Sequence, residues 1–277
     1  MDSRPPVIRL AVLGSPVIHS LSPRIHSMFG AQLALNVDYR AIEATQASFA
    51  GLLRALAGDG GRGCNVTVPL KRDAWQLAGR CSDAAARACA ANVLVFRDGD
   101  DWFADNTDGR GLVDDLQSGP GCELKDARIC LLGAGGAAAG VLGALLQTGP
   151  QAVVIANRTL ERAADLAARH ADLGAVEPCT PDGIGTRGPF DLFVNATSLG
   201  HEASAPLIDP QWLTAGGLCY DLNYGRAAAP LRETCAAVGI PYSDGLGMLV
   251  GQAALSFELW TGQRPDTAPV LQALREH

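Results

Sequence analysis

A glycine-rich turn directly follows an apolar strand near the middle of the chain, and it constrains the fold more than any other feature. The apolar run Arg128–Leu132 leads into Gly133-Ala134-Gly135-Gly136-Ala137-Ala138. This spacing predicts a helix from the turn to about residue 147 and a second strand at 152–156. Glycines allow a tight turn and let backbone N–H groups approach a pyrophosphate at the positive end of a helix. The pattern predicts a nucleotide-binding strand–turn–helix–strand unit.

Strand and helix signals alternate along the sequence, which predicts an α/β fold. Ser22 is the expected N-cap of the first helix, with Pro23 at its first position. An Asp-Gly turn at 97–101 predicts a hairpin. Further strands are expected at 7–13, 39–42, 63–68, 93–96, 102–104, 190–194 and 218–222, and further helices at 48–56, 160–170 and 246–262.

Bulk properties exclude several classes of function. The 277 residues suffice for two domains. A net charge of −7 without a dense Lys/Arg run argues against nucleic-acid binding. No apolar stretch has the length of a membrane span, and the start resembles no signal peptide, so we expect a soluble cytoplasmic protein without membrane contact. The eight cysteines form no Cys-x-x-Cys pair, which favours buried, reduced thiols and no metal site.

The run Asn65-Val66-Thr67-Val68-Pro69-Leu70-Lys71 places polar groups along an apolar strand. Alternation predicts that Val66 and Val68 share a buried face, while Asn65 and Thr67 present an amide and a hydroxyl on the other. Lys71 then stands just past the strand end, where active sites of α/β proteins tend to lie. The alternative is an edge strand followed by a solvated lysine.

The end of the strand 152–156 indicates which nucleotide binds. NAD-specific folds place an Asp or Glu there for the ribose hydroxyls. This chain has Asn157-Arg158-Thr159 instead, with Arg162 one turn later. Guanidinium groups pair with a 2′-phosphate, so the sequence favours NADP as the cofactor. The alternative is a plain helix start with Thr159 as its cap.

Several polar loops complete a pattern that resembles one family. The loop His19-Ser20-x-Ser22-Pro23, the Asn65–Lys71 run, Asn106-Thr-Asp108-Gly, the glycine turn, Asn157-Arg-Thr, Asn195-Ala-Thr-Ser and Asp244-Gly-Leu-Gly-Met occur in this order. Alone, Asp108 and the serines would be read as helix caps. Together, these motifs are similar to those of the NADP-dependent shikimate dehydrogenase family, over residues 7–271.

The resemblance implies a reversible NADPH-dependent reduction of 3-dehydroshikimate to shikimate, in aromatic amino-acid biosynthesis. It implies a substrate and catalytic domain at 1–108 and 246–277, and a Rossmann-like, doubly wound NADP domain at 109–245. The partner is a small-molecule substrate, and both a monomer and a homodimer stay open. Two alternatives remain, a quinate/shikimate dehydrogenase with relaxed cofactor use and a non-catalytic NADP-sensing module.

The resemblance also implies roles for individual residues. Val93, Ala90 and Ala229 depart from the family pattern, which leaves the catalytic pair intact but bears on the shape of the substrate pocket. The implied catalytic residues are Lys71 and Asp108; the implied substrate contacts are Ser20, Ser22, Asn65, Thr67, Asn92, Asp108, Tyr224 and Gln252; the implied NADP contacts are Gly133, Ala134, Gly135, Gly136, Ala137, Asn157, Arg158, Thr159, Arg162, Leu222 and Gly245.

Overall fold

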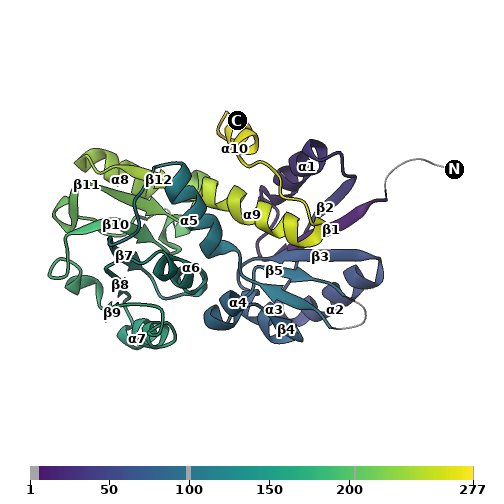
Figure 1. Cartoon of the computed structure of the whole chain (residues 1–277), viewed down its shortest axis with the longest axis horizontal. Coiled ribbons are helices and arrows are strands. Elements are labelled where there is room, and N and C mark those ends of the chain that lie inside the picture. The colour runs from purple at the N-terminus through teal and green to yellow at the C-terminus, as the bar shows by residue number, and fades with distance from the viewer. Residues whose placement is uncertain (1–5, 98–100, 203, 277) are drawn as a thin grey trace. The chain divides into compact units, whose positions relative to one another are not determined.

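The computed structural model describes residues 6–97, 101–202 and 204–276. The chain forms two compact units, the first made of Met1–Thr107 and Val250–His277 and the second of Asp108–Leu249. Each is an α/β unit with its own sheet (Figure 1). Helix α9 (Leu246–Thr261) crosses the sequence boundary between them, and most of its residues belong to the first unit.

The first unit is built on a six-stranded mixed sheet in the order β2-β1-β3-β5-β6-β4. β1 pairs in parallel with β2 and β3, whereas β5 runs antiparallel to β3 and β6. The predicted hairpin is therefore present, although its turn at 98–100 lies outside the described residues. The elements are β1 (Ile8–Gly14), α1 (Ser22–Gln32), β2 (Val37–Glu43), α2 (Gln46–Gly58), β3 (Gly61–Val66), α3 (Lys71–Leu77), β4 (Arg80–Cys81), α4 (Asp83–Ala88), β5 (Val93–Val95), β6 (Phe103–Asp105) and α10 (Ala268–Arg275).

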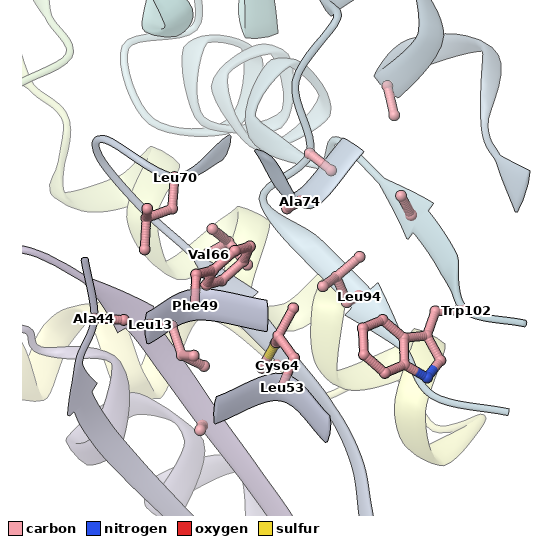
Figure 2. Packing of buried hydrophobic residues seen from close by; sticks show 14 residues of the cluster. Leu13, Ala44, Phe49, Leu53, Cys64, Val66, Leu70, Ala74, Leu94 and Trp102 are labelled. Atoms are coloured by element: carbon pink, nitrogen blue, oxygen red, sulfur yellow. The ribbon is translucent and has the colours of Figure 1, made fainter. Parts of the chain in front are cut away.

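Both faces of this sheet are covered by buried clusters. Successive side chains of β1 point to opposite faces, and they join a different cluster on each. Ala11 and Leu13 join a buried cluster with Phe49 of α2 and Leu94 of β5, drawn in Figure 2. Leu10 and Val12 join a second cluster that includes Tyr39 and Trp260 of α9. Helix α9 is thus part of the core of the N-terminal sheet.

The strand prediction for 63–68 was wrong in its length and its alternation. β3 ends at Val66, and Cys64, Asn65 and Val66 are all buried because both faces of the sheet are covered at this strand, which lies between β1 and β5. Val68 lies beyond the strand and is 66% exposed. The alternative of an edge strand is excluded by the same pairing.

The start of the first helix also differs from the prediction. α1 begins at Ser22 itself, and its N-cap is Leu21, which makes no side-chain cap. Ser20 takes part instead, since its hydroxyl accepts the backbone N–H of Ser22. Of the cysteines, all free, Cys81 is exposed; the buried ones are Cys64, Cys130, Cys179, Cys219 and Cys235.

The second unit is a parallel sheet in the order β12-β11-β10-β7-β8-β9. Read from β7 as the first strand, this is the 3-2-1-4-5-6 order of a doubly wound dinucleotide-binding fold. The order reverses between β7 and β10, and ligands bind such folds outside the carboxyl ends of those strands. The elements are α5 (Asp108–Ser118), β7 (Arg128–Leu132), α6 (Gly136–Gln147), β8 (Ala152–Ala156), α7 (Leu160–Ala168), β9 (Val176–Cys179), β10 (Phe190–Asn195), β11 (Leu213–Asp221), α8 (Ala229–Val238) and β12 (Tyr242–Asp244).

None of the helices in the described ranges is long and apolar enough to cross a lipid bilayer.

Candidate active site

The loop after β1 brings the two candidate serines into one turn. The hydroxyl of Ser20 accepts the N–H of Ser22 over 3.2 Å, and the N–H of Ser20 donates to the carbonyl of Val17 over 3.0 Å. Ser22 is buried at the first residue of α1. This turn places two hydroxyl groups at the carboxyl end of β1.

Asn65, the next candidate, is held by three side-chain bonds. Its oxygen Oδ1 accepts from the Tyr39 hydroxyl over 2.8 Å. Its Nδ2 donates to the carbonyl of Asn92 over 3.1 Å and to the Ser256 hydroxyl over 2.9 Å. Both amide hydrogens are therefore engaged, whereas Oδ1 keeps a second lone pair. Asn65 is set up to accept a hydrogen bond from a ligand rather than to donate one.

Asn92, which directly precedes β5, joins the same network. Its Nδ2 donates to the Thr107 hydroxyl and to Oε1 of Gln252, each over 3.0 Å. Its Oδ1 accepts the backbone N–H of Thr107 over 2.8 Å. Thr107 in turn donates to the carbonyl of Gln252 over 3.1 Å. The network joins three candidate substrate contacts, Asn65, Asn92 and Gln252.

Lys71 starts helix α3 beside this network. Its carbonyl accepts the N–H of Ala91 over 2.8 Å, which fixes the start of α3 next to Asn92. Thr67 follows β3 and donates its N–H to the carbonyl of Leu13 over 2.9 Å. These bonds place the backbone of Lys71 and Thr67 beside the segments that carry Asn92 and Asn65.

An aromatic cluster supports the network from within the core. His26 stacks on Tyr39 with ring centroids 4.2 Å apart and also contacts Phe29, Phe257 and Trp260. Burial lowers the pKa of His26 to about 3, and the nearby Asn65 amide opposes this only in part. Burial also raises the pKa of Tyr39 well above its usual value. Both rings are therefore neutral near pH 7.

Two further candidates belong to the second unit. Asp108 is buried and begins α5, directly after Thr107 in the chain. Tyr224 precedes a short 3-10 helix at Gly225–Ala228, and burial raises the pKa of its phenol. Asp108 lies where the chain leaves the hydrogen-bond network, and Tyr224 lies just after β11.

The glycine turn has the geometry that a phosphate site requires. Gly133 has φ +111°, and a Cβ there would lie 3.0 Å from the carbonyl oxygen of Ala196. Gly135 and Gly136 are exposed, and a Cβ on either would meet nothing within 4 Å. Gly135 is the N-cap of α6 and has no side-chain cap. The N-terminal end of α6 is therefore open to an anion such as a pyrophosphate.

The end of β8 presents cations rather than a carboxylate. Asn157 donates Nδ2 to the carbonyl of Thr159 over 2.8 Å, and this bond shapes the turn. Arg158 and Arg162 are exposed on this turn and on the first turn of α7. Thr159 is the N-cap by position, but its side chain makes no cap bond. The residues present fit the 2′-phosphate of NADP.

Leu222 and Gly245 lie side by side at the ends of β11 and β12. A Cβ on Gly245 would lie 2.4 Å from the carbonyl oxygen of Leu222, and Gly245 donates its N–H to the carbonyl of Asn223 over 2.9 Å. Leu222 donates its own N–H to the carbonyl of Asn195 on β10. These contacts place both candidate cofactor residues at the carboxyl edge of the sheet, and Leu222 directly beside the end of β10.

Three residues of the network, Tyr39, Thr107 and Ser256, were not predicted from the sequence as parts of the site. Thr107 stands inside the Asn106-Thr-Asp108 motif, and Ser256 follows Gln252 by one helical turn, so both carried a local signal. Tyr39 carried none, because it meets Asn65 only through the pairing of β1 with β2 and β3.

Three protein-family models match the chain. They are the shikimate dehydrogenase substrate binding domain over residues 12–94, shikimate / quinate 5-dehydrogenase over 116–181, and the shikimate 5′-dehydrogenase C-terminal domain over 245–275.

Similar proteins cover the chain almost completely. A shikimate dehydrogenase (NADP(+)) of Xanthomonas euvesicatoria pv. vesicatoria is 48% identical over 276 residues, which is 98% of this chain and 96% of that protein. The crystal structure of an Ael1 enzyme from Pseudomonas putida is 38% identical, with a TM-score of 0.87 over 96% of this chain and 98% of that one. The shikimate 5-dehydrogenase of Thermus thermophilus in complex with NADP(H) and shikimate is 34% identical, with a TM-score of 0.83 over 97% and 99%.

Proposed function

This chain belongs to the shikimate dehydrogenase family, and we propose that it catalyses the reversible NADPH-dependent reduction of 3-dehydroshikimate to shikimate. This reaction belongs to aromatic amino-acid biosynthesis. The first unit is proposed to bind the substrate and the second to bind NADP.

The observation that carries the proposal is the position of Lys71 beside the network of neutral polar groups. The network supplies amide groups from Asn65, Asn92 and Gln252, and the backbone of Lys71 is fixed next to it by the bond from Ala91. Shikimate carries hydroxyls and one carboxylate, which such groups bind. We assign Ser20 and Ser22 to the substrate carboxylate. We assign the network residues, together with Thr67 and Tyr224, to the substrate hydroxyls.

Lys71 and Asp108 are the proposed catalytic pair. Oxidation of a secondary alcohol requires that a base removes the hydroxyl proton, and an amine whose charge is tuned by its surroundings can serve. We propose that Nζ of Lys71 takes this proton and returns it in the reverse direction. The Asp108 carboxylate would hold the same hydroxyl and the lysine in register.

NADP supplies hydride acceptor and donor chemistry when it is bound. We propose that the α6 N-terminus, with Gly133, Gly135 and Gly136, holds the pyrophosphate, and that Arg158 and Arg162 hold the 2′-phosphate. The residues assigned to the remaining contacts are Ala134, Ala137, Asn157, Thr159, Leu222 and Gly245.

A four-way assay tests the proposal, with shikimate or quinate as substrate and NADP or NAD as cofactor. We expect the highest kcat/KM for shikimate with NADP. Equal values for the two acids would place the enzyme in the quinate/shikimate branch. Complete lack of shikimate-dependent NADPH formation would favour an NADP-sensing module instead.

We also propose that the enzyme acts in the cytoplasm, where the NADP pool and the small-molecule substrate are available. Sedimentation of the pure protein would distinguish a monomer from a homodimer.

A further inference from the structure

A buried carboxylate in the second unit is used by none of the roles described so far. Asp221 ends β11, is 1% exposed, and lies at the carboxyl edge of the sheet where the cofactor is proposed to bind. Burial of a charged group is costly unless hydrogen bonds replace its hydration. Burial also raises the pKa of Asp221, and its hydrogen-bond donors oppose that change. A carboxylate kept at such a place calls for an explanation.

Four hydrogen bonds converge on this carboxylate. Oδ1 accepts from Nδ2 of Asn195 over 2.9 Å, and from N and Nδ2 of Asn223 over 3.1 and 2.8 Å. Oδ2 accepts from the Tyr242 hydroxyl over 3.4 Å. The donors are the last residue of β10, a residue just after β11 and the first residue of β12. An ionised carboxylate, which only accepts, suits this arrangement of donors.

The bonds from Asp221 extend into the loop that follows β10. Asn195 uses its other side-chain atom, Oδ1, to accept the N–H of Thr197 over 3.1 Å and the Thr197 hydroxyl over 2.7 Å. Asn223 donates Nδ2 to the carbonyl of Thr197 over 3.0 Å. The loop 195–197 is therefore fixed from both sides by residues that Asp221 orients.

This loop is a wall of the proposed cofactor site. Ala196 donates its N–H to the carbonyl of Leu132 over 2.8 Å, and its own carbonyl oxygen is the atom that a Cβ on Gly133 would approach to 3.0 Å. On the other side, Asn195 accepts the N–H of Leu222. A shift of the loop would change the space at both the glycine turn and Leu222.

We propose that Asp221 is a positioning residue that holds the loop 195–197 against the glycine turn and thereby sets the shape of the cofactor site. It touches neither the substrate nor the cofactor. Because Leu222 and Gly133 serve the part of the cofactor shared by NADP and NAD, loss of Asp221 weakens both cofactors equally. This inference rests on the proposed function, since the probe is the cofactor assigned there.

The test measures dissociation constants for NADPH and NADH by fluorescence titration, without turnover. In Asp221→Ala, we expect both constants to rise by at least about tenfold, or about 1.4 kcal/mol, with their ratio unchanged. Asp221→Asn keeps an oxygen that can accept the three bonds on Oδ1 but loses the charge, so we expect a partial rescue with a rise of about threefold. Hydrogen bonds to charged groups are stronger than those to neutral ones.

Asp191→Asn is the matched control. Asp191 lies on the same strand as Asn195 but near its amino end, where it accepts the N–H of Arg128 over 2.8 Å and the Thr214 hydroxyl over 3.0 Å. We expect this change to leave both dissociation constants as in the parent.

Unchanged dissociation constants in the Asp221 variants, with a lower unfolding midpoint, would show that Asp221 only supports the fold and would overturn the proposal. Loss of NADPH affinity alone would also overturn it. If Asp221→Ala does not fold, Asp221→Asn decides, and parent-like binding in that variant would overturn the proposal. A parent protein that binds NADPH but does not oxidise shikimate would contradict the proposed function, while the Asp221 test would still stand.

Discussion

Nδ2 of Asn92 donates to Oε1 of Gln252 over 3.0 Å, although 160 residues separate the two side chains in sequence. Gln252, Ser256 and Trp260 repeat every fourth residue along α9, and each makes a hydrogen bond to the N-terminal sheet or its loops. The proposed substrate side of the enzyme is therefore assembled from both ends of the chain.

We expect Ser256→Ala to destabilise the protein by about 1–3 kcal/mol. Ser256 is fully buried and accepts one of the two Nδ2 hydrogens of Asn65, which would lose its partner in the core. Urea unfolding measures the change. Ser27→Ala on the exposed face of α1 is the control and should stay within about 0.5 kcal/mol of the parent.

Lys71→Met should fold and bind NADPH like the parent but lose about 10²–10⁴-fold in kcat. The reason is that the variant lacks the group proposed to move the hydroxyl proton. Lys125→Met, which changes the only other lysine of the chain, is the control and should keep parent activity. A kcat within a few-fold of the parent would remove Lys71 from its catalytic role.

Arg158→Ala should raise the KM for NADP at least about tenfold and leave the KM for NAD nearly unchanged. A charge-assisted hydrogen bond to the 2′-phosphate contributes about 1.5–3 kcal/mol to NADP binding. NAD has no 2′-phosphate, so its binding does not depend on this bond. High salt should reproduce part of the effect by screening. Arg169→Ala, at the C-terminal end of α7, is the control. Equal weakening of both cofactors would mean that Arg158 supports the fold.

The sequence was most informative where a function depends on consecutive residues. The glycine turn could be predicted because its strand, loop and helix are adjacent in the chain, and the second unit has the doubly wound strand order. The basic residues after β8 could be read in the same way. Such motifs depend on residues that are neighbours in the chain, so they can be predicted without knowing which distant segments they contact.

The contacts of Asn65 could not be predicted. Its partner Ser256 lies 191 residues away, and no local pattern names it. The predicted alternation of 63–68 failed for a related reason, since β3 is covered on both faces and buries consecutive residues. Asp221 was missed because its donors come from three separate strand ends.

Two glycines of the nucleotide turn should give opposite results when changed to alanine. Gly133→Ala places a Cβ in a left-handed conformation close to Ala196, so we expect a loss of about 1–3 kcal/mol in stability. Gly135→Ala meets open space and should cost at most about 1 kcal/mol as a change of N-cap. It should still weaken NADPH binding, because the methyl group lies where the pyrophosphate approaches. Unfolding and NADPH titration of both variants distinguish the two effects.

His26 should make the stability of the protein depend on pH below neutrality. Its pKa is about 3 in the folded state, against 6.5 as the ordinary value, because it is buried among aromatic rings. Between these values the unfolded chain binds a proton that the folded protein does not. The contribution of the neutral His26 ring to the free energy of unfolding is therefore complete above pH 6.5. Below pH 6.5 it falls by about 1.4 kcal/mol per pH unit.

His26→Phe keeps an aromatic ring in the cluster and removes this titration. The difference in unfolding free energy between parent and variant should move by about 2 kcal/mol between pH 7 and pH 5, in favour of the variant at the lower pH. Carboxylates titrate in both proteins, so their contribution cancels in the difference. A parent–variant difference that is constant from pH 7 to pH 5 would mean that His26 accepts its proton in the folded protein, and the dry aromatic environment described for it would be wrong.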